Sequence, residues 1–270
     1  MLKKIFVFLF TLASLPSFTQ TIDDILTTYE EKNGGKERFA ATTTLQYNST
    51  IKMNMMGMPM DLPVATFIET GKLFRKEMSG MFGMKGSYTL ITDTGGFTFV
   101  PTVPAFGEFP GMEGGIKKMD EETYSTAKQK MSAMADFAAL IDCRNKGFVP
   151  ELLGTEKLDS GTCYKIKLTN RDGSFTTYFV DQNTYLIKQV ELVGKQIIDM
   201  LGVSGGPMKD MMGGRIDKQK MKVLFTEYAT IDGIKFPTKQ KLQLGAVDIE
   251  IENSDIQMNT VIDKKWYSNK

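Results

Sequence analysis

Histidine is absent from this sequence, and cysteine and tryptophan are scarce. The 270 residues include no His, two Cys and one Trp. Without an imidazole, neither a Ser-His-Asp nor a Cys-His catalytic system can form. Zinc sites that depend on histidine are impossible for the same reason, and two cysteines are too few for a site of four thiolates. We therefore expect a protein that is not an enzyme and that has no metal site or other cofactor.

The charges are balanced, so no large excess of one sign points to a charged partner. The chain has 33 Lys and Arg against 32 Asp and Glu, a formal net charge of +1. A nucleic-acid-binding protein usually has a basic stripe that contacts phosphates, and this sequence has none, so nucleic acid is not an expected partner. A chain of this length can bury a complete core, and we expect one globular domain and a monomer.

The longest apolar run is short and lies near the N-terminus. Lys3 and Lys4 precede the eleven residues 5–15 (IFVFLFTLASL), and residues 16–20 (PSFTQ) follow them. Eleven helical residues rise about 16 Å, too little to span a hydrocarbon core of about 30 Å. The pattern is typical of a secretory signal peptide. We predict a signal peptide over residues 1–19, cleaved near 19/20 or 20/21, and a single soluble periplasmic domain over residues 20–270.

Most of the remaining chain alternates between polar and apolar residues. From Leu45 to Met55 the odd positions are mostly apolar, while the even positions 46–54 are polar. This is the pattern of a strand with one wet and one dry face. The alternation returns at residues 164–168, 234–242 and 247–252. Asp172-Gly173 and Asp232-Gly233 are suited to hairpin turns. We predict a mainly β fold of about ten strands, as one large curved antiparallel sheet or half-open β-barrel.

Two segments have helical spacing instead. In residues 21–32 the apolar side chains share one face, and Asn33-Gly34-Gly35 supplies a stop before a short continuation over residues 36–41. Residues 120–141 form the second segment, and their three leading acids suit the positive end of a helix dipole. Its apolar stripe consists of Tyr124, Ala127, Met131, Met134, Ala138 and Ile141. We predict that this central helix covers the apolar face of the sheet.

Methionine is used far more than usual. The chain has 19 Met, with the densest cluster in residues 53–60 (MNMMGMPM). Thioethers bind Cu(I), so a periplasmic Cu(I)-binding protein is one interpretation. The interpretation we favour is that unbranched, adaptable methionines line a core or a cavity for irregular apolar ligands. The predicted lining residues, on the first strand and the central helix, are Leu45, Tyr47, Ile51, Met53, Met55, Tyr124, Met131 and Met134.

The two cysteines, Cys143 and Cys163, are twenty residues apart. An even number of cysteines in an exported chain permits a disulfide. The alternative is a pair of isolated thiols. The spacing alone leaves both alternatives open.

Several stretches resemble, in order, the outer-membrane lipoprotein-sorting proteins (LolA/LolB-like) of Bacteroidetes-type bacteria. The resemblance starts with the exported N-terminus, the helix that ends in residues 33–37 (NGGKE) and the Met-rich first strand through Met60. Its later parts are residues 135–142 (ADFAALID), 151–156 (ELLGTE), 164–168 (YKIKL), 181–186 (DQNTYL) and 232–237 (DGIKFP). The chain departs from the family at residues 93–97 (DTGGF) and in the Gly- and Met-rich insertion 202–214. The family's docking residues have no match here.

The resemblance implies a half-open β-barrel closed by helices over an apolar cavity. It also implies a non-catalytic carrier or receptor that shelters lipoprotein acyl chains or other lipids in the periplasm. An inner-membrane donor and an outer-membrane acceptor would be its partners. The alternative from a different class is a cell-envelope structural or interaction protein with a Met-rich core, and a carboxylate-based hydrolase is the third hypothesis.

Overall fold

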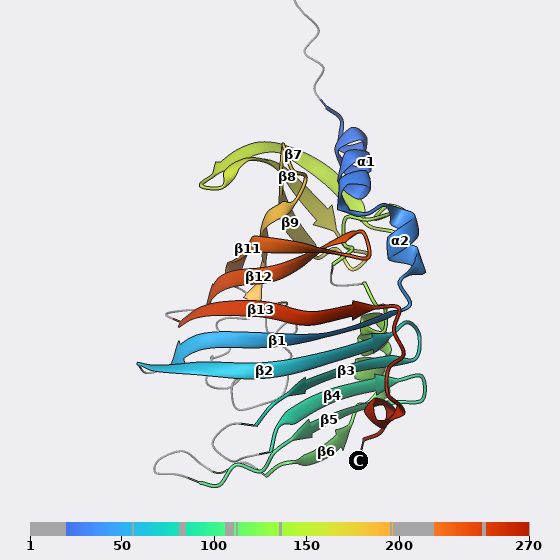
Figure 1. The fold of residues 1–270 in the computed structure, drawn as a ribbon, viewed down its shortest axis with the longest axis vertical. Helices are drawn as coiled ribbons and strands as arrows, with labels where there is room; N and C mark the ends of the chain where they lie inside the picture. Colours follow the sequence, from blue (N-terminus) through green and yellow to red (C-terminus); the bar gives the residue numbers. More distant parts are fainter. Residues whose placement is uncertain are drawn as a thin grey trace, which may run out of the picture.

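The computed structural model describes residues 20–55, 57–80, 85–105, 111, 113–134, 137–194, 196, 219–244 and 247–269. These ranges contain one antiparallel sheet of thirteen strands (Figure 1). The first six strands are β1 (Thr44–Met55), β2 (Met58–Glu69), β3 (Leu73–Met78), β4 (Ser87–Thr92), β5 (Gly96–Val100) and β6 (Gly115–Lys118). The others are β7 (Val149–Leu158), β8 (Gly161–Thr169), β9 (Phe175–Asp181), β10 (Ile187–Val193), β11 (Lys220–Ile231), β12 (Ile234–Leu244) and β13 (Val247–Met258).

The sheet consists of two meanders that meet at its centre. Its order is β6-β5-β4-β3-β2-β1-β13-β12-β11-β10-β9-β8-β7, so the last strand pairs with the first. In that junction Ile51 lies opposite Ile251. Within the described ranges β6 and β7 form the two free edges, and the sheet is not closed into a barrel. The prediction of a mainly β, curved antiparallel sheet is confirmed.

The number of strands is larger than the ten that the alternation predicts. The second strand, β2, contains Pro59 and Pro63, which lie opposite Asn54 and Thr50 of β1. Proline usually argues against an interior strand because it cannot donate to the ladder. Here β2 nonetheless lies between β1 and β3. Its prolines argue against β2 in the sequence, but pairing with β1 and β3 on its two sides makes it an interior strand.

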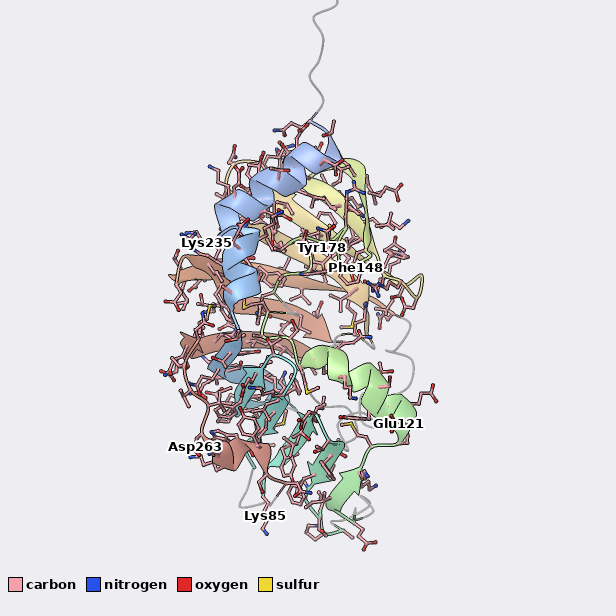
Figure 2. All side chains as sticks on the ribbon, turned by 90° about the vertical axis from the view of Figure 1, so that its right-hand side faces the viewer. Lys85, Glu121, Phe148, Tyr178, Lys235 and Asp263 are labelled. Carbon is pink, nitrogen blue, oxygen red and sulfur yellow. The ribbon has the colours of Figure 1, made fainter. Side chains whose placement is uncertain are left out.

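The N-terminal helices follow the prediction. Helix α1 (Ile22–Asn33) begins with a capping box between Thr21 and Asp24. It ends at Gly34, whose φ of 131° favours glycine. Helix α2 (Lys36–Ala41) is the short continuation. Figure 2 shows both helices and α3 (Glu121–Ala127) in front of one face of the sheet, which we call the inner face.

The predicted central helix over residues 120–141 is wrong beyond its first turns. Helix α3 ends at Ala127 and continues only as a 3-10 turn, η1 (Lys128–Lys130). Beyond it the backbone bonds to the β2–β3 turn: Gly71 N donates to Met131 O at 2.8 Å, and Ala133 N donates to Thr70 Oγ1 at 3.2 Å. We call residues 131–134 and 137–148 the covering segment, because their apolar side chains are buried against the inner face.

Three apolar clusters stabilise the two faces. The main cluster joins the helices and the covering segment to the inner face and includes Ile25, Leu45 and Phe236. A second cluster lies farther along β1 on the same face and includes Ile51 and Met53. The third lies on the opposite, outer face, where the C-terminal segment with η2 (Lys264–Tyr267) packs over β2, β3 and β4. None of the helices in the described ranges combines the length and hydrophobicity needed to cross a membrane.

Both cysteines are free, buried thiols. Cys143 belongs to the main cluster on the inner side of the sheet. Cys163 precedes the inward-facing Tyr164 on β8, so strand alternation places it on the outer face. The sheet separates the two sulfur atoms, and the permitted disulfide is not formed. Burial raises the pKa of both thiols, that of Cys163 to about 11.

Candidate functional site: a cavity beneath the helices

A cavity of about 890 Å³ lies between the helical layer and the inner face of the sheet. Helices α1 and α2 and the covering segment form one wall, and strands β8 to β12 form the other. Figure 2 shows Phe148 and Tyr178, one from each wall, beside the N-terminal helices. Ligand sites in proteins commonly enclose about 300–1,000 Å³, so this space is large enough for a bound molecule.

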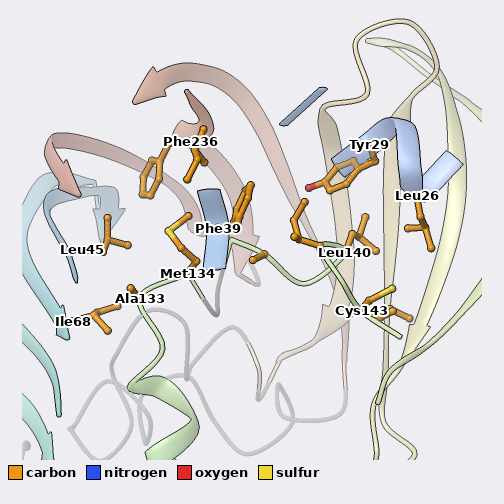
Figure 3. Packing of buried hydrophobic residues seen from close by; sticks show 14 of the residues in the cluster. Leu26, Tyr29, Phe39, Leu45, Ile68, Ala133, Met134, Leu140, Cys143 and Phe236 are labelled. Carbon is orange, nitrogen blue, oxygen red and sulfur yellow. The ribbon is translucent and has the colours of Figure 1, made fainter. Parts of the chain in front are cut away.

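Apolar side chains make up most of the walls. The helices and the covering segment contribute Phe39, Ala40, Met134, Phe137, Ala138, Ala139, Ile141 and Phe148. The strands contribute Leu168, Ile187, Val190, Leu192, Val223, Phe225 and Pro237. At one border three aromatic rings pack together: the Phe137 ring centroid lies 4.3 Å from that of Phe236 and 6.0 Å from that of Tyr47. Figure 3 shows Phe39, Met134 and Phe236 gathered in this region.

Charged groups of both signs occur on the cavity lining. They are Lys36, Glu37, Asp142, Lys146 and Lys235. The Lys146 ammonium donates to the Ala138 carbonyl at 2.9 Å. Partial burial lowers the pKa of this lysine, while the nearby Asp142 opposes the shift. Because neither sign dominates, the lining charge does not select strongly for an anionic or a cationic ligand.

Three tyrosines add phenol groups to this lining: Tyr29 of α1, Tyr178 of β9 and Tyr228 of β11. The Tyr228 hydroxyl donates to the Ile187 carbonyl at 2.8 Å. Burial raises the pKa of Tyr29, and the neighbouring Tyr178 and Glu30 add to the rise. Burial likewise raises the pKa of Tyr228, and Tyr29 contributes. The phenols of Tyr29 and Tyr228 therefore stay protonated near neutral pH and remain hydrogen-bond donors.

The structure distributes the predicted lining residues over several places. Met134 lines the cavity. Tyr47 is partly buried against the main cluster, which also contains Leu45, Tyr124 and Met131. Ile51 and Met53 are buried in the second cluster. The side chain of Met55 lies outside the described residues. Contact of this set with a ligand stays a prediction.

Sequence reasoning missed most of the actual lining. Phe39, Phe148 and Tyr178 come from three different elements. Alternation could have identified Tyr178 as a residue of the same face as Val180, because side chains two residues apart on a strand point to one side of the sheet. No local signal marks Phe148, the last residue of the covering segment before β7.

Most of the described methionines lie in apolar surroundings, while Met58 is exposed. Met53, Met60, Met78 and Met221 belong to or pack against the second cluster, and Met119, Met131, Met134 and Met258 to the main one. In the ranges that the structure covers, no group of three His, Cys, Asp or Glu side chains is placed to hold a metal ion. The Gly- and Met-rich insertion 202–214 lies outside the described residues.

Solved structures with this architecture exist, although no family model and no curated protein sequence matches the chain. A LolA superfamily protein from Nitrosomonas europaea superposes with a TM-score of 0.54 at 13% identity, over 90% of this chain and 98% of that one. The fold is LolA-like. A putative outer-membrane lipoprotein-sorting protein domain from Vibrio parahaemolyticus has a TM-score of 0.51 at 9% identity, over 90% of this chain and 94% of that one. A DUF1329 family protein from Desulfovibrio piger superposes with a TM-score of 0.55 at 12% identity, over 90% of this chain and 97% of that one.

These identities are low, so the likeness concerns the LolA-like fold alone. At this level the resemblance seen in the sequence is confirmed: the neighbours include LolA superfamily and lipoprotein-sorting proteins. Any ligand of this chain must be argued from its own cavity.

Proposed function

We propose that this protein is a non-catalytic periplasmic carrier or receptor for lipoprotein acyl chains or other lipids. The observation that carries the proposal is the cavity of about 890 Å³ with mostly apolar walls beneath the helices. An apolar space of this size suits flexible hydrocarbon, which needs volume and adaptable walls more than fixed polar contacts. The LolA-like fold supports the same function, and so does the N-terminal pattern of a signal peptide.

Burial of an acyl chain in the cavity supplies enough free energy for such binding. Each methylene that leaves water contributes about 0.8 kcal/mol, so twelve contribute on the order of 10 kcal/mol before association costs. Methionine and phenylalanine side chains such as Met134 and Phe225 can line chains of different shape without one fixed geometry. Outer-membrane lipoprotein sorting, with a donor and an acceptor at the two membranes, is the process in which we place the carrier.

The test is to fill the cavity without adding a charge. Ala139 lines the cavity and is partly buried, whereas Ala41 is exposed at the end of α2. We expect Ala139→Trp to weaken binding of the neutral fluorophore N-phenyl-1-naphthylamine by about tenfold or more, because the indole occupies the ligand's space. Ala41→Trp makes the same substitution away from the cavity and should bind the probe as the wild type does.

Two results would contradict the proposal: a wild-type protein that never binds the probe, or an Ala139→Trp variant that folds and binds as well as Ala41→Trp. Circular dichroism of both variants establishes that they fold alike. Native mass spectrometry of the protein isolated from its own cells identifies the cargo, since a carrier purified without detergent should retain lipid.

A further inference from the structure

Tyr29 is a buried side chain with a polar group on the wall of the cavity, near Tyr178 and Tyr228. It is only 3% exposed, and it lines the cavity from α1. Within the described part of the chain the Tyr228 hydroxyl donates to the Ile187 carbonyl, whereas the Tyr29 hydroxyl makes no such bond. Thr66 Oγ1 is the fully buried side-chain oxygen without a partner in the described residues, so the Tyr29 hydroxyl reaches the cavity space and is not sealed in the core. Figure 3 shows the hydroxyl end of Tyr29 directed away from Leu26, toward Phe39 and Leu140. A phenol hydroxyl that reaches a cavity can donate a hydrogen bond to a molecule bound there.

The Tyr29 hydroxyl is not needed to satisfy the polar group next to it on the same helix. The polar neighbour on the same helix, Asn33, is already satisfied: its Nδ2 donates to the carbonyls of Tyr29 and Tyr185 at 2.8 and 2.9 Å. The Tyr29 ring itself packs in the main cluster, so phenylalanine would fill the same volume. The hydroxyl is therefore a group on the cavity wall that packing does not need.

We propose that the Tyr29 hydroxyl binds the ester carbonyl of an acylglycerol group, so that the cavity selects acyl esters over plain hydrocarbon. The inference rests on the proposed function and adds the chemical class of the ligand. A carbonyl oxygen accepts from a phenol, and an acylglycerol carries that oxygen at the head of its chain. The apolar walls take the methylenes, while Tyr178 and Tyr228 add two further phenols to the cavity lining.

A matched pair of ligands isolates this hydrogen bond. 1-Lauroylglycerol and 1-O-dodecylglycerol have the same head group and chain length, and they differ in the carbonyl oxygen. We measure how well each displaces N-phenyl-1-naphthylamine from the wild type, from Tyr29→Phe and from Tyr88→Phe. Tyr88 is the control, because its hydroxyl donates to the Asn269 carbonyl on the outer face of the sheet.

The wild type and Tyr88→Phe should bind the ester about five- to tenfold more tightly than the ether, the ratio that one net hydrogen bond supplies. Tyr29→Phe should lose this preference through weaker ester binding, with ether binding unchanged. Equal binding of ester and ether by the wild type would overturn the inference alone, as would a preference that survives in Tyr29→Phe. Failure of both ligands and of the probe would overturn the proposed function.

A third ligand distinguishes the sources of the ester. An S-diacylglyceryl-cysteine peptide carries the acylglycerol group of a lipoprotein, whereas 1-lauroylglycerol represents a free glycerolipid. Sensitivity of both ligands to Tyr29→Phe supports the inference. Tighter binding of the peptide assigns the site to lipoproteins, and tighter binding of the lauroylglycerol assigns it to free lipid. Insensitivity of both ligands to the substitution contradicts the inference.

Discussion

At the scale of single residues, charge pairing across the outer face is the clearest feature. The Glu252 carboxylate of β13 lies 2.5 Å from the Lys52 ammonium of β1 and 3.0 Å from that of Lys239 on β12. Lys239 also reaches Glu250 at 3.2 Å, so the pairs form a ladder over three strands. Such pairs on a wet face favour one register of neighbouring strands and are screened by salt.

The ladder predicts an acid-dependent contribution to stability. The hydrogen bonds from Lys52 and then Lys239 lower the pKa of Glu252 from 4.5 to about 2. A carboxyl with a lowered folded-state pKa stabilises the fold above its unfolded pKa, and this contribution disappears as the pH falls toward 2. We expect Glu252→Gln to lower the urea midpoint at pH 6, and the difference from the wild type to vanish near pH 2.

Glu31→Gln, at an exposed position of α1, controls for the loss of one negative charge. High salt should reduce the effect of Glu252→Gln, because the carboxylate is solvent-exposed. An effect of the substitution that is the same at pH 6 and pH 2 would contradict the prediction.

At the scale of elements, the corner between α1 and α2 sits directly on the β11–β12 hairpin. A Cβ on Gly34 would lie 2.9 Å from the Gly233 carbonyl oxygen and 3.1 Å from the Ile234 Cα. This contact holds the N-terminal helices over the cavity, because the turn between them has no room to move toward the sheet. The corner depends on a glycine for its backbone angle and for its lack of a side chain.

Two glycine substitutions separate these requirements. Gly71, in the β2–β3 turn, has φ of 74° and nothing within 4 Å of an added Cβ. Gly71→Ala should therefore cost only the left-handed backbone penalty of about 1–2 kcal/mol. Gly34→Ala should cost about 1–3 kcal/mol more, because its Cβ forces two backbones apart. Urea unfolding measures both free energies, and equal losses would show that the corner can yield.

For the predicted central helix over residues 120–141, the sequence pattern predicts the buried side chains correctly but the secondary structure wrongly. Met131, Met134, Ala138 and Ile141 are buried, as their helical spacing indicates. The backbone is nevertheless irregular, because Gly71 and Thr70, about sixty residues earlier in the chain, bond to Met131 and Ala133. Periodicity reports which side chains face the core, and it does not identify the partner of each peptide group.

At the scale of the whole molecule, the C-terminal segment covers part of the outer face. The Trp266 ring stacks on Phe67 of β2 with centroids 4.2 Å apart. The buried Arg75 guanidinium donates to the Ser268 carbonyl at 2.5 Å and to the Trp266 carbonyl at 3.2 Å, and it lies 5.6 Å from the Trp266 ring centre. The C-terminal segment thus supplies carbonyl acceptors to the buried guanidinium of Arg75.

Trp266 is the chain's one tryptophan, so its fluorescence reports docking of this segment. We expect Phe67→Ala to shift the emission to longer wavelength and to lower the free energy of unfolding by about 1–3 kcal/mol, through lost burial and stacking. Phe99→Ala removes a ring that stacks on Tyr88 instead and should leave the emission unchanged. An unshifted spectrum in Phe67→Ala would contradict the stacking.

Patterns within a few neighbouring residues were enough to predict many elements. The alternation from Leu45 to Met55 predicted β1, and Asp232-Gly233 predicted the hairpin between β11 and β12. The stop at residues 33–35 predicted the break between α1 and α2. In each case the side-chain period or the allowed φ of glycine acts locally, so no distant residue is needed to read it.

The sequence by itself determined that this protein would be one mainly β sheet with an apolar face and helices to cover it. The tertiary structure alone decided that β13 pairs with β1, that Cys143 and Cys163 lie on opposite faces, and that Phe148 and Tyr178 line one cavity. The physical reason is the separation in sequence over which each effect acts. Hydrophobic periodicity and turn preferences act over a few residues, whereas a cavity is the volume that elements distant in the chain leave unfilled when they pack.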